Sequence, residues 1–150
     1  MTNDLGGLMK GEVIIRQAES GNLPEVKSLL QEMRLPIAGL ENHVEHLFIL
    51  ESHSRVLGAV DFEAYPPYVL LRSLVVAPQV QGQGYGRRLL QFILDEVKIQ
   101  GFLEAYALTT TIPNWLVRLG FEEISRSDVP EGLQASAELQ EVPVQPQHWS

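Results

Sequence analysis

The sequence predicts one domain of the mixed α/β class. Its 150 residues are enough for a single domain with its own hydrophobic core. Strand patterns rich in β-branched residues alternate with amphipathic helix patterns, and no segment repeats. We therefore expect one domain over residues 1–150, with a flexible N-terminus over 1–11.

The first strand and the first helix follow directly after this N-terminus. Residues 12–18 predict a strand. Residues 23–33 predict a helix because their apolar side chains share one helical face. Asn22 is its expected cap, with Glu25 three positions further on.

The next segment predicts a hairpin and a further strand. Residues 35–45 predict a loop with a short helix. Residues 46–51 and 56–63 predict the two strands of a hairpin that turns at 52–55. Residues 68–76 predict the strand that follows the Tyr65-Pro-Pro67 break.

The second half begins with the main helix. Residues 86–100 predict this helix, which ends at Gly101. Residues 103–108 and 121–124 predict strands, and 112–119 predicts a short helix between them. The pattern fades after residue 125, so we expect an irregular tail over about 133–150.

Glycines are concentrated at the junction between the strand 68–76 and the main helix. Gly82, Gly84 and Gly86 alternate there, which lets the backbone approach a ligand closely. The helix that begins at this point directs unpaired N–H groups and the positive end of its dipole into the loop. The junction therefore predicts an anion site, while a tight turn without a ligand is the alternative.

Two phosphate-binding motifs do not fit this junction. A nucleoside triphosphate loop needs a lysine after its last glycine, and no lysine lies between Lys27 and Lys98. A dinucleotide fingerprint needs a third glycine where Arg87 stands. The loop thus argues against kinases and ATPases, and only weakly suggests a dinucleotide enzyme.

The loop resembles the acetyl-coenzyme A loop of GNAT acyltransferases, in which Gln/Arg-x-x-Gly-x-Gly/Ala joins a strand to a helix. Here that string is Gln81-Gly-Gln-Gly84-Tyr-Gly86, followed by Arg87-Arg-Leu-Leu90. The stretch from Leu108-Thr-Thr-Thr111 through Trp115 to Gly120-Phe121 extends the likeness to about residues 13–132. It is similar to the acyltransferase domain of N-acetylglutamate synthases and to small acetyltransferases associated with arsenic resistance.

The resemblance implies a GNAT fold, in which a mostly antiparallel sheet carries helices on both faces. It also implies acetyl-coenzyme A as co-substrate and transfer of its acetyl group to an amine. Backbone groups beside the splayed fourth strand would hold the pantetheine arm, loop amides the pyrophosphate, and the Thr109 hydroxyl another cofactor contact. The implied cofactor residues are Leu74, Val75, Val76, Gln81, Gly82, Gln83, Gly84, Tyr85, Gly86, Arg87 and Thr109.

The catalytic positions depart from the family pattern. Relatives carry a base early in the fourth strand, where this chain has an apolar residue near Leu70, so Glu63 is our substitute. The usual acid is a tyrosine, and Leu116 stands in its place. Tyr106, the hydroxyls of 109–111, or water are the alternatives for protonating the thiolate.

The acceptor class is left open. A small anionic acceptor such as an amino acid needs a basic clamp, for which Arg16 and Arg72 are candidates. A large cationic acceptor would instead suit the acidic surface, with four attractors: Glu41, Glu45, Asp61 and Glu63. The function we expect is N-acetylation of a small primary amine, with an acyl-coenzyme A sensor or a protein acetyltransferase as alternatives.

Charge and composition limit the partners. Eleven basic against nineteen acidic residues give a net charge of −8, which disfavours nucleic acid and anionic membranes. The chain has no cysteine, so disulfides and thiolate chemistry are excluded, and His43 and His46 have no companion that would complete a metal site. No apolar signal or membrane segment is visible, so we expect a cytoplasmic protein that binds no metal and could form a homodimer.

Overall fold

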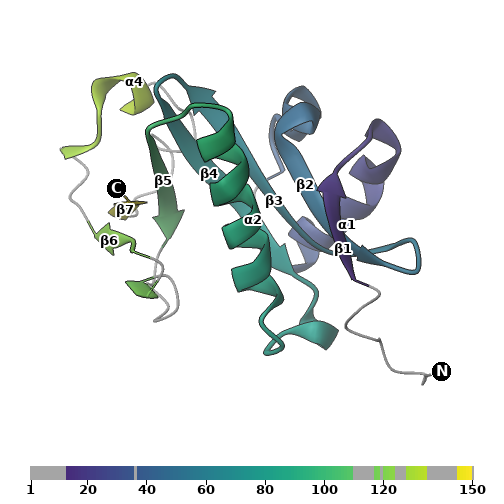
Figure 1. Cartoon of the computed structure of the whole chain (residues 1–150). Helices are drawn as coiled ribbons and strands as arrows, with labels where there is room; N and C mark the ends of the chain where they lie inside the picture. The colour runs from purple at the N-terminus through teal and green to yellow at the C-terminus, as the bar shows by residue number, and fades with distance from the viewer. Residues whose placement is uncertain are drawn as a thin grey trace. The chain divides into compact units, whose positions relative to one another are not determined.

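The computed structural model describes residues 13–35, 37–109, 117–118, 120–123, 128–134 and 145–149 (Figure 1). Its contacts divide the chain into two compact units, each of which is described by itself. The first unit contains Met1–Asp61 and Ser73–Ile93, and the second contains Phe62–Arg72 and Leu94–Ser150. The expectation of one domain stays a prediction.

Three antiparallel strands form the sheet of the first unit. Strand β1 (Ile14–Gln17) pairs with β2 (Leu47–Ser52), which pairs with β3 (Arg55–Tyr65). The predicted first strand and hairpin are thereby confirmed. β3 is three residues longer than expected, one at its start and two at its end, and its last four residues belong to the second unit.

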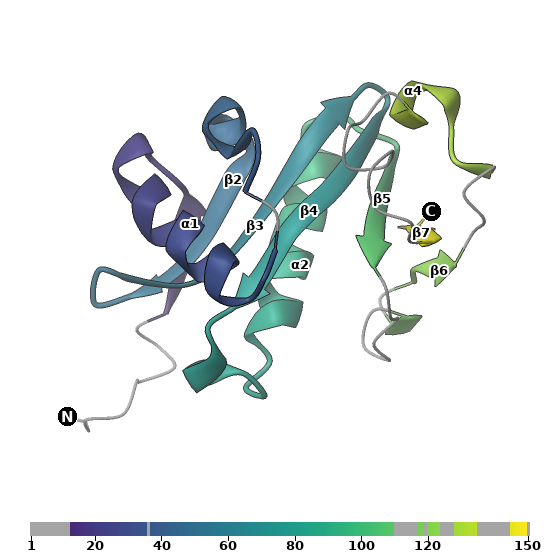
Figure 2. The same ribbon diagram turned by 180° about the vertical axis from the view of Figure 1, so that it is seen from behind.

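Helices cover both faces of the sheet in the first unit. Helix α1 (Leu23–Glu32) buries Val26, Leu29 and Leu30 on one face. The first part of α2 (Tyr85–Ile99), up to residue 93, lies on the other, as the opposite views of Figures 1 and 2 show. The 3-10 helices η2 (Ser20–Asn22), η3 (Leu40–His46) and η4 (Pro78–Val80) complete this unit.

The predicted cap of α1 is wrong in its details. Asn22 makes no side-chain cap bond to α1, because its Oδ1 accepts a hydrogen bond from the Glu19 N–H at the preceding 3-10 turn. The Glu25 carboxylate accepts from the Val56 N–H at 2.9 Å instead, which joins the helix to the start of β3. A long-range partner has replaced the local one that the sequence pattern indicated.

The second unit contains a mixed sheet. β4 (Tyr68–Val76) pairs in parallel with β5 (Glu104–Thr109), and β5 pairs antiparallel with β7 (Gln145–Trp149). β6 (Glu122–Glu123) joins the other edge of β7, so the strand order in this unit is β3-β4-β5-β7-β6. Since most pairs in both units are antiparallel, the predicted sheet type is confirmed.

The end of the chain contains more structure than expected. Residues from about 133 to 150 were predicted to be irregular. Within them β7 is a proline-containing strand that lies between β5 and β6. A short helix α4 (Glu131–Gln134) precedes it. Most of the predicted helix 112–119 lies outside the described residues, of which 117–118 are helical.

Aromatic and aliphatic side chains form the core of the second unit. Leu70, Tyr106, Val129 and Leu133 pack together, and Tyr65 and Tyr68 pack against them. The Tyr68 and Tyr106 rings meet edge to face at 6.0 Å. Among the described residues, no helix has the length and apolar character needed to cross a membrane.

Candidate functional site

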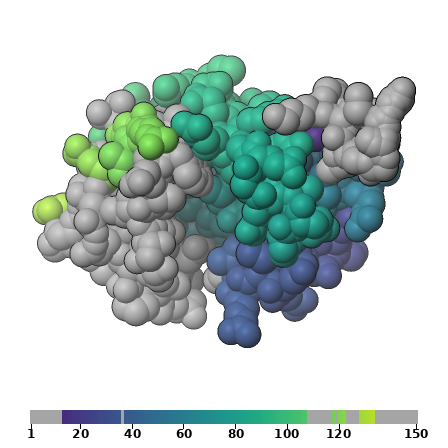
Figure 3. Space-filling model, turned by 90° about the horizontal axis from the view of Figure 1, so that it is seen from below, coloured from purple at the N-terminus to yellow at the C-terminus, as the bar shows by residue number. Residues whose placement is uncertain are grey.

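The loop between β4 and α2 has a backbone that glycine adopts most readily. Gly82 and Gly84 have φ values of 83° and 85°, a left-handed conformation that other residues adopt at a cost. Residues 81–84 are exposed, and a Cβ at Gly82 or Gly84 would meet no protein atom within 4 Å. The loop and the helix start lie at the lower end of α2 in Figure 1 and contribute to the teal surface in Figure 3. Both glycines therefore border solvent, where a ligand can approach.

The first turn of α2 supplies amide donors at this loop. The helix begins at Tyr85, one residue earlier than expected, and the Arg88 N–H already bonds to the Gly84 carbonyl at 3.2 Å. The N–H groups of the first turn precede the intrahelical ladder and are available to an anion. Arg87 and Arg88 are both exposed beside them.

Tyr85 contributes to this site through its backbone. Its side chain is only 2% exposed, and the Arg88 guanidinium lies 5.7 Å from the centre of its ring. This cation–π contact was not foreseen from the sequence. The ring anchors the first turn of α2 in the core, and only the Tyr85 N–H remains as a candidate ligand contact.

The side chain of Gln81 braces the loop. Its Nε2 donates to the Val76 carbonyl at 3.0 Å, which ties the start of the loop to the end of β4. The expected role of Gln81 concerned its backbone amide, and the side-chain contact adds a support for that amide. One lone pair of the Val76 carbonyl therefore already has a protein donor.

Ser73 breaks the regular geometry of β4 just before the expected pantetheine site. Its φ is 60°, although it is not glycine, whereas the parallel register with β5 covers Tyr68–Leu71. A left-handed residue inside a strand turns the next peptide groups out of the regular ladder. The backbone therefore departs from regular strand geometry just before Leu74, and the sequence contained no signal that would have identified Ser73.

Gly58 allows the end of β4 to approach β3 closely. A Cβ at Gly58 would lie 2.9 Å from Leu89 Cδ1 and 3.0 Å from the Val75 carbonyl oxygen. The Ala77 N–H donates to the Leu57 carbonyl at 2.8 Å nearby. The base of the loop is therefore held against β3 by close backbone contact, which the sequence analysis missed.

Glu63 and Arg72, the expected base and one expected clamp, contact each other in the second unit. Arg72 Nη1 donates to Glu63 Oε2 at 3.2 Å, with side chains 5% and 12% exposed respectively. The Tyr65 hydroxyl donates to Glu63 Oε1 at 3.1 Å. Both oxygens of the candidate base thus accept hydrogen bonds from side chains.

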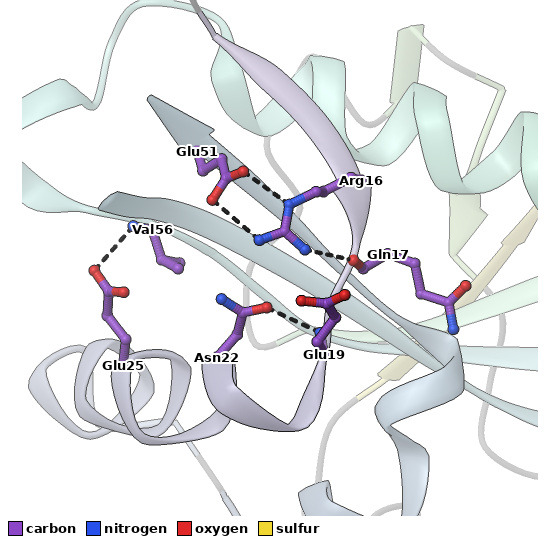
Figure 4. A network of polar contacts seen from close by, with 7 residues as sticks. All are labelled: Arg16, Gln17, Glu19, Asn22, Glu25, Glu51 and Val56. Atoms are coloured by element: carbon purple, nitrogen blue, oxygen red, sulfur yellow. Dashed lines mark hydrogen bonds and ion pairs between the residues drawn. The ribbon is translucent and has the colours of Figure 1, made fainter. Parts of the chain in front are cut away.

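Arg16, the other expected clamp, binds Glu51 through a two-point contact (Figure 4). Its Nε and Nη2 donate to the two carboxylate oxygens at 2.7 and 3.2 Å, and Nη1 donates to the Gln17 carbonyl. The hydrogen bond to Glu51 raises the pKa of Arg16 above its ordinary value. This geometry favours a structural role at the β1–β2 pair.

Replacing Arg16 by glutamine should therefore lower stability modestly. We expect the free energy of unfolding to fall by about 0.5–1 kcal/mol, since the pair is partly exposed. Urea unfolding of Arg16→Gln, Glu51→Gln and the double variant would isolate the pairwise energy. A coupling that persists unchanged at 1 M NaCl would contradict an exposed ion pair.

Tyr106, the candidate acid, donates its hydroxyl hydrogen to Glu104 Oε1 at 2.8 Å. Burial raises the pKa of Tyr106 well above its usual value, and the Glu104 carboxylate adds to the effect. A phenol with a raised pKa is a weaker proton donor. The geometry therefore supports packing and the Glu104 bond as roles of Tyr106 better than it supports acid catalysis.

Tyr106→Phe should change how stability depends on pH. Folding favours the neutral phenol, so Tyr106 contributes stability that is complete below its unfolded pKa of about 10 and is lost as pH rises above it. We expect wild-type stability to fall more steeply above pH 10 than that of Tyr106→Phe. Parallel slopes in urea unfolding from pH 8 to 11 would contradict the raised pKa.

The acidic residues proposed for a cationic acceptor have other surroundings. Asp61 is fully buried, so it cannot attract a large ligand from the surface. Glu41 pairs with Lys27 at 2.5 Å, and this contact lowers the pKa of Glu41.

The side chain of Thr109 lies outside the described residues, as do residues 110 and 111. Within the described ranges, no group of three or more His, Asp or Glu side chains could hold a metal.

Comparison with known proteins decides the family. A model of the acetyltransferase (GNAT) domain matches residues 43–123. An amino-acid acetyltransferase of Neisseria meningitidis is 33% identical over 128 residues, which cover 79% of this chain and 29% of the relative. The chain belongs to the GNAT acetyltransferase family. It spans less than a third of the length of this curated relative.

Solved structures agree with the GNAT fold. N-acetylglutamate synthase from Neisseria gonorrhoeae, complexed with coenzyme A and N-acetyl-glutamate, has a TM-score of 0.80 at 29% identity. The match covers 91% of this chain and 34% of that one. A GNAT acetyltransferase from Staphylococcus aureus Mu50 has a TM-score of 0.74 at 15% identity, covering 91% and 98%, and supports the fold alone.

Proposed function

We propose that this protein transfers the acetyl group of acetyl-coenzyme A to the primary amine of an amino acid or a related small molecule. The observation that carries the proposal is the exposed Gly82–Gly84 loop, which borders open space beside the first-turn N–H groups of α2. The relative from N. meningitidis is an amino-acid acetyltransferase, and the N. gonorrhoeae enzyme was solved with coenzyme A and an acetylated amino acid. Both support this donor and this acceptor class.

Different residues are proposed to bind the different parts of acetyl-coenzyme A and of the acceptor. In this proposal, amides from Gln81 to Arg87 hold the pyrophosphate, and backbone groups of Leu74 and Val76 hold the pantetheine arm. Thr109 remains a proposed cofactor contact. Arg72 is the proposed clamp for the acceptor carboxylate because it lies beside the proposed base Glu63, whereas Arg16 holds Glu51 by a two-point contact. Glu63 is the proposed base, and the thiolate leaves with a proton from water or a nearby hydroxyl.

A sensor that binds acyl-coenzyme A without turnover is the second candidate. Its support is specific: both candidate catalytic groups are occupied, Glu63 by Arg72 and Tyr65, and Tyr106 by Glu104. Cytoplasmic location and a homodimer remain expectations that no observation tests.

Two measurements on the same preparation separate the candidates. Calorimetry with acetyl-coenzyme A tests binding, and thiol release over a panel of free amino acids and amines tests turnover. An acetyltransferase binds the cofactor and releases coenzyme A with at least one acceptor. A sensor binds and never releases it, and a protein without binding contradicts both candidates.

A further inference from the structure

The contact between Glu63 and Arg72 places the proposed base and the proposed acceptor clamp in one ion pair. The side chains are 12% and 5% exposed, and the Nη1–Oε2 distance is 3.2 Å. They come from neighbouring strands of the second unit, β3 and the first part of β4. Neither group can change partner without affecting the other.

This arrangement restrains both groups while no acceptor is present. A general base needs a lone pair open to the proton it removes, and one lone pair on each Glu63 oxygen already accepts a hydrogen bond, from Tyr65 on one oxygen and from Arg72 on the other. Removing one partner of a buried pair leaves an uncompensated charge, which is costly. Exchanging one carboxylate for another keeps the charge on Arg72 balanced.

We propose that the acceptor's carboxylate displaces Glu63 from Arg72, and that Glu63 then accepts a proton from the acceptor's ammonium group. The inference rests on the function proposed above and adds a coupling between its two acceptor contacts. The acceptor's carboxylate then pairs with Arg72 and its ammonium with Glu63, and Tyr65 can keep its bond to Glu63 throughout. An acceptor with both an amine and a carboxylate therefore offers an opposite charge to each member of the pair.

The acetyl transfer that follows this exchange conserves every proton and bond. The ammonium loses one proton to Glu63, and its nitrogen attacks the thioester carbonyl carbon. The C–N bond forms as the C–S bond breaks, the second proton leaves nitrogen and the thiolate takes up a proton. The Glu63 proton passes to solvent, so one amide, one thiol and one proton result.

The test compares each reactive amino acid with its α-carboxamide, which keeps the amine and lacks the carboxylate. In Arg72→Gln we expect kcat/KM for the amino acid to fall about tenfold or more through loss of a charge-assisted contact. For the carboxamide we expect kcat/KM to rise, because Glu63 is no longer held by Arg72. A role in folding alone would lower both values together.

Formate supplies a second readout on the wild-type protein. As a small carboxylate it can occupy Arg72, so we expect it to accelerate acetylation of the carboxamide, relative to sodium chloride at equal ionic strength. Arg72→Gln should show no such activation. The Lys27→Gln control breaks another ion pair of the chain, Lys27–Glu41, and should keep the wild-type ratio between the two acceptors.

Several outcomes would overturn the coupling. Equal losses for both acceptors in a folded Arg72→Gln protein that still binds coenzyme A would do so, as would the absence of formate activation in the wild type. If Arg72→Gln does not fold, Arg72→Lys replaces it, and an unchanged acceptor ratio then counts against the coupling. Coenzyme A binding without any turnover removes the proposed function and the coupling together.

Discussion

Replacing Gly84 by alanine is expected to weaken coenzyme A binding about tenfold or more, a loss near 1.4 kcal/mol. Gly84 has a φ of 85°, and an L-residue with a Cβ pays about 1–2 kcal/mol in the left-handed region. The loop can relieve this strain only by turning its peptide groups. The amides at the start of α2 would then no longer face the same point.

Gly84→Asn separates strain from crowding. Asparagine tolerates the left-handed region better than alanine does, so the loop should keep its shape. No protein atom lies within 4 Å of a Cβ added at Gly84. A side chain there would therefore occupy the volume expected for the phosphates. If both variants weaken binding, crowding dominates; if only alanine does, backbone strain dominates.

Gly21→Ala is the matched control for these loop variants. It also faces open space, without a φ in the left-handed region. Calorimetry with coenzyme A should give the wild-type affinity for Gly21→Ala and a weakened one for Gly84→Ala. Wild-type affinity for coenzyme A in a folded Gly84→Ala protein would contradict a phosphate site that depends on this glycine.

The features of the site that could be predicted are those that depend on residues close together in the sequence. Alternating glycines after a β-branched strand indicated a turn into a helix with a backbone open to close approach, because glycine has no Cβ. Gly82 and Gly84 lie in this turn, in the left-handed conformation. The same locality explains why β2, β3 and the two main helices were predicted close to their observed bounds.

The missed features depend on contacts between distant residues. No spacing rule indicates that Glu63 and Arg72, nine positions apart, meet across two strands, or that Arg16 pairs with Glu51. β7 was missed for a related reason. Its polar, proline-containing sequence has little strand preference, and it is defined by its pairing with β5 and β6.

Gly58→Ala is expected to destabilise the fold by about 2 kcal/mol, a shift of about 5 °C in Tm for a chain of this size. Alanine normally gains about 0.5–1 kcal/mol over glycine in a strand, so the sign of the change reports the clash. The Leu89 methyl can move aside cheaply, but the Val75 carbonyl oxygen, 3.0 Å from the new Cβ, belongs to the backbone.

The displaced carbonyl links stability to cofactor binding. Val75 lies between Leu74 and Val76, whose backbone groups are the proposed pantetheine contacts, so Gly58→Ala should also weaken coenzyme A binding although Gly58 touches no proposed ligand atom. Thermal unfolding with and without coenzyme A measures both effects.

Gly132→Ala, whose Cβ meets open space, is the control and should keep the wild-type Tm or raise it slightly. A Gly58→Ala protein as stable as the wild type would show that β4 yields to the added methyl group, and that close packing against β3 does not fix the cofactor strand.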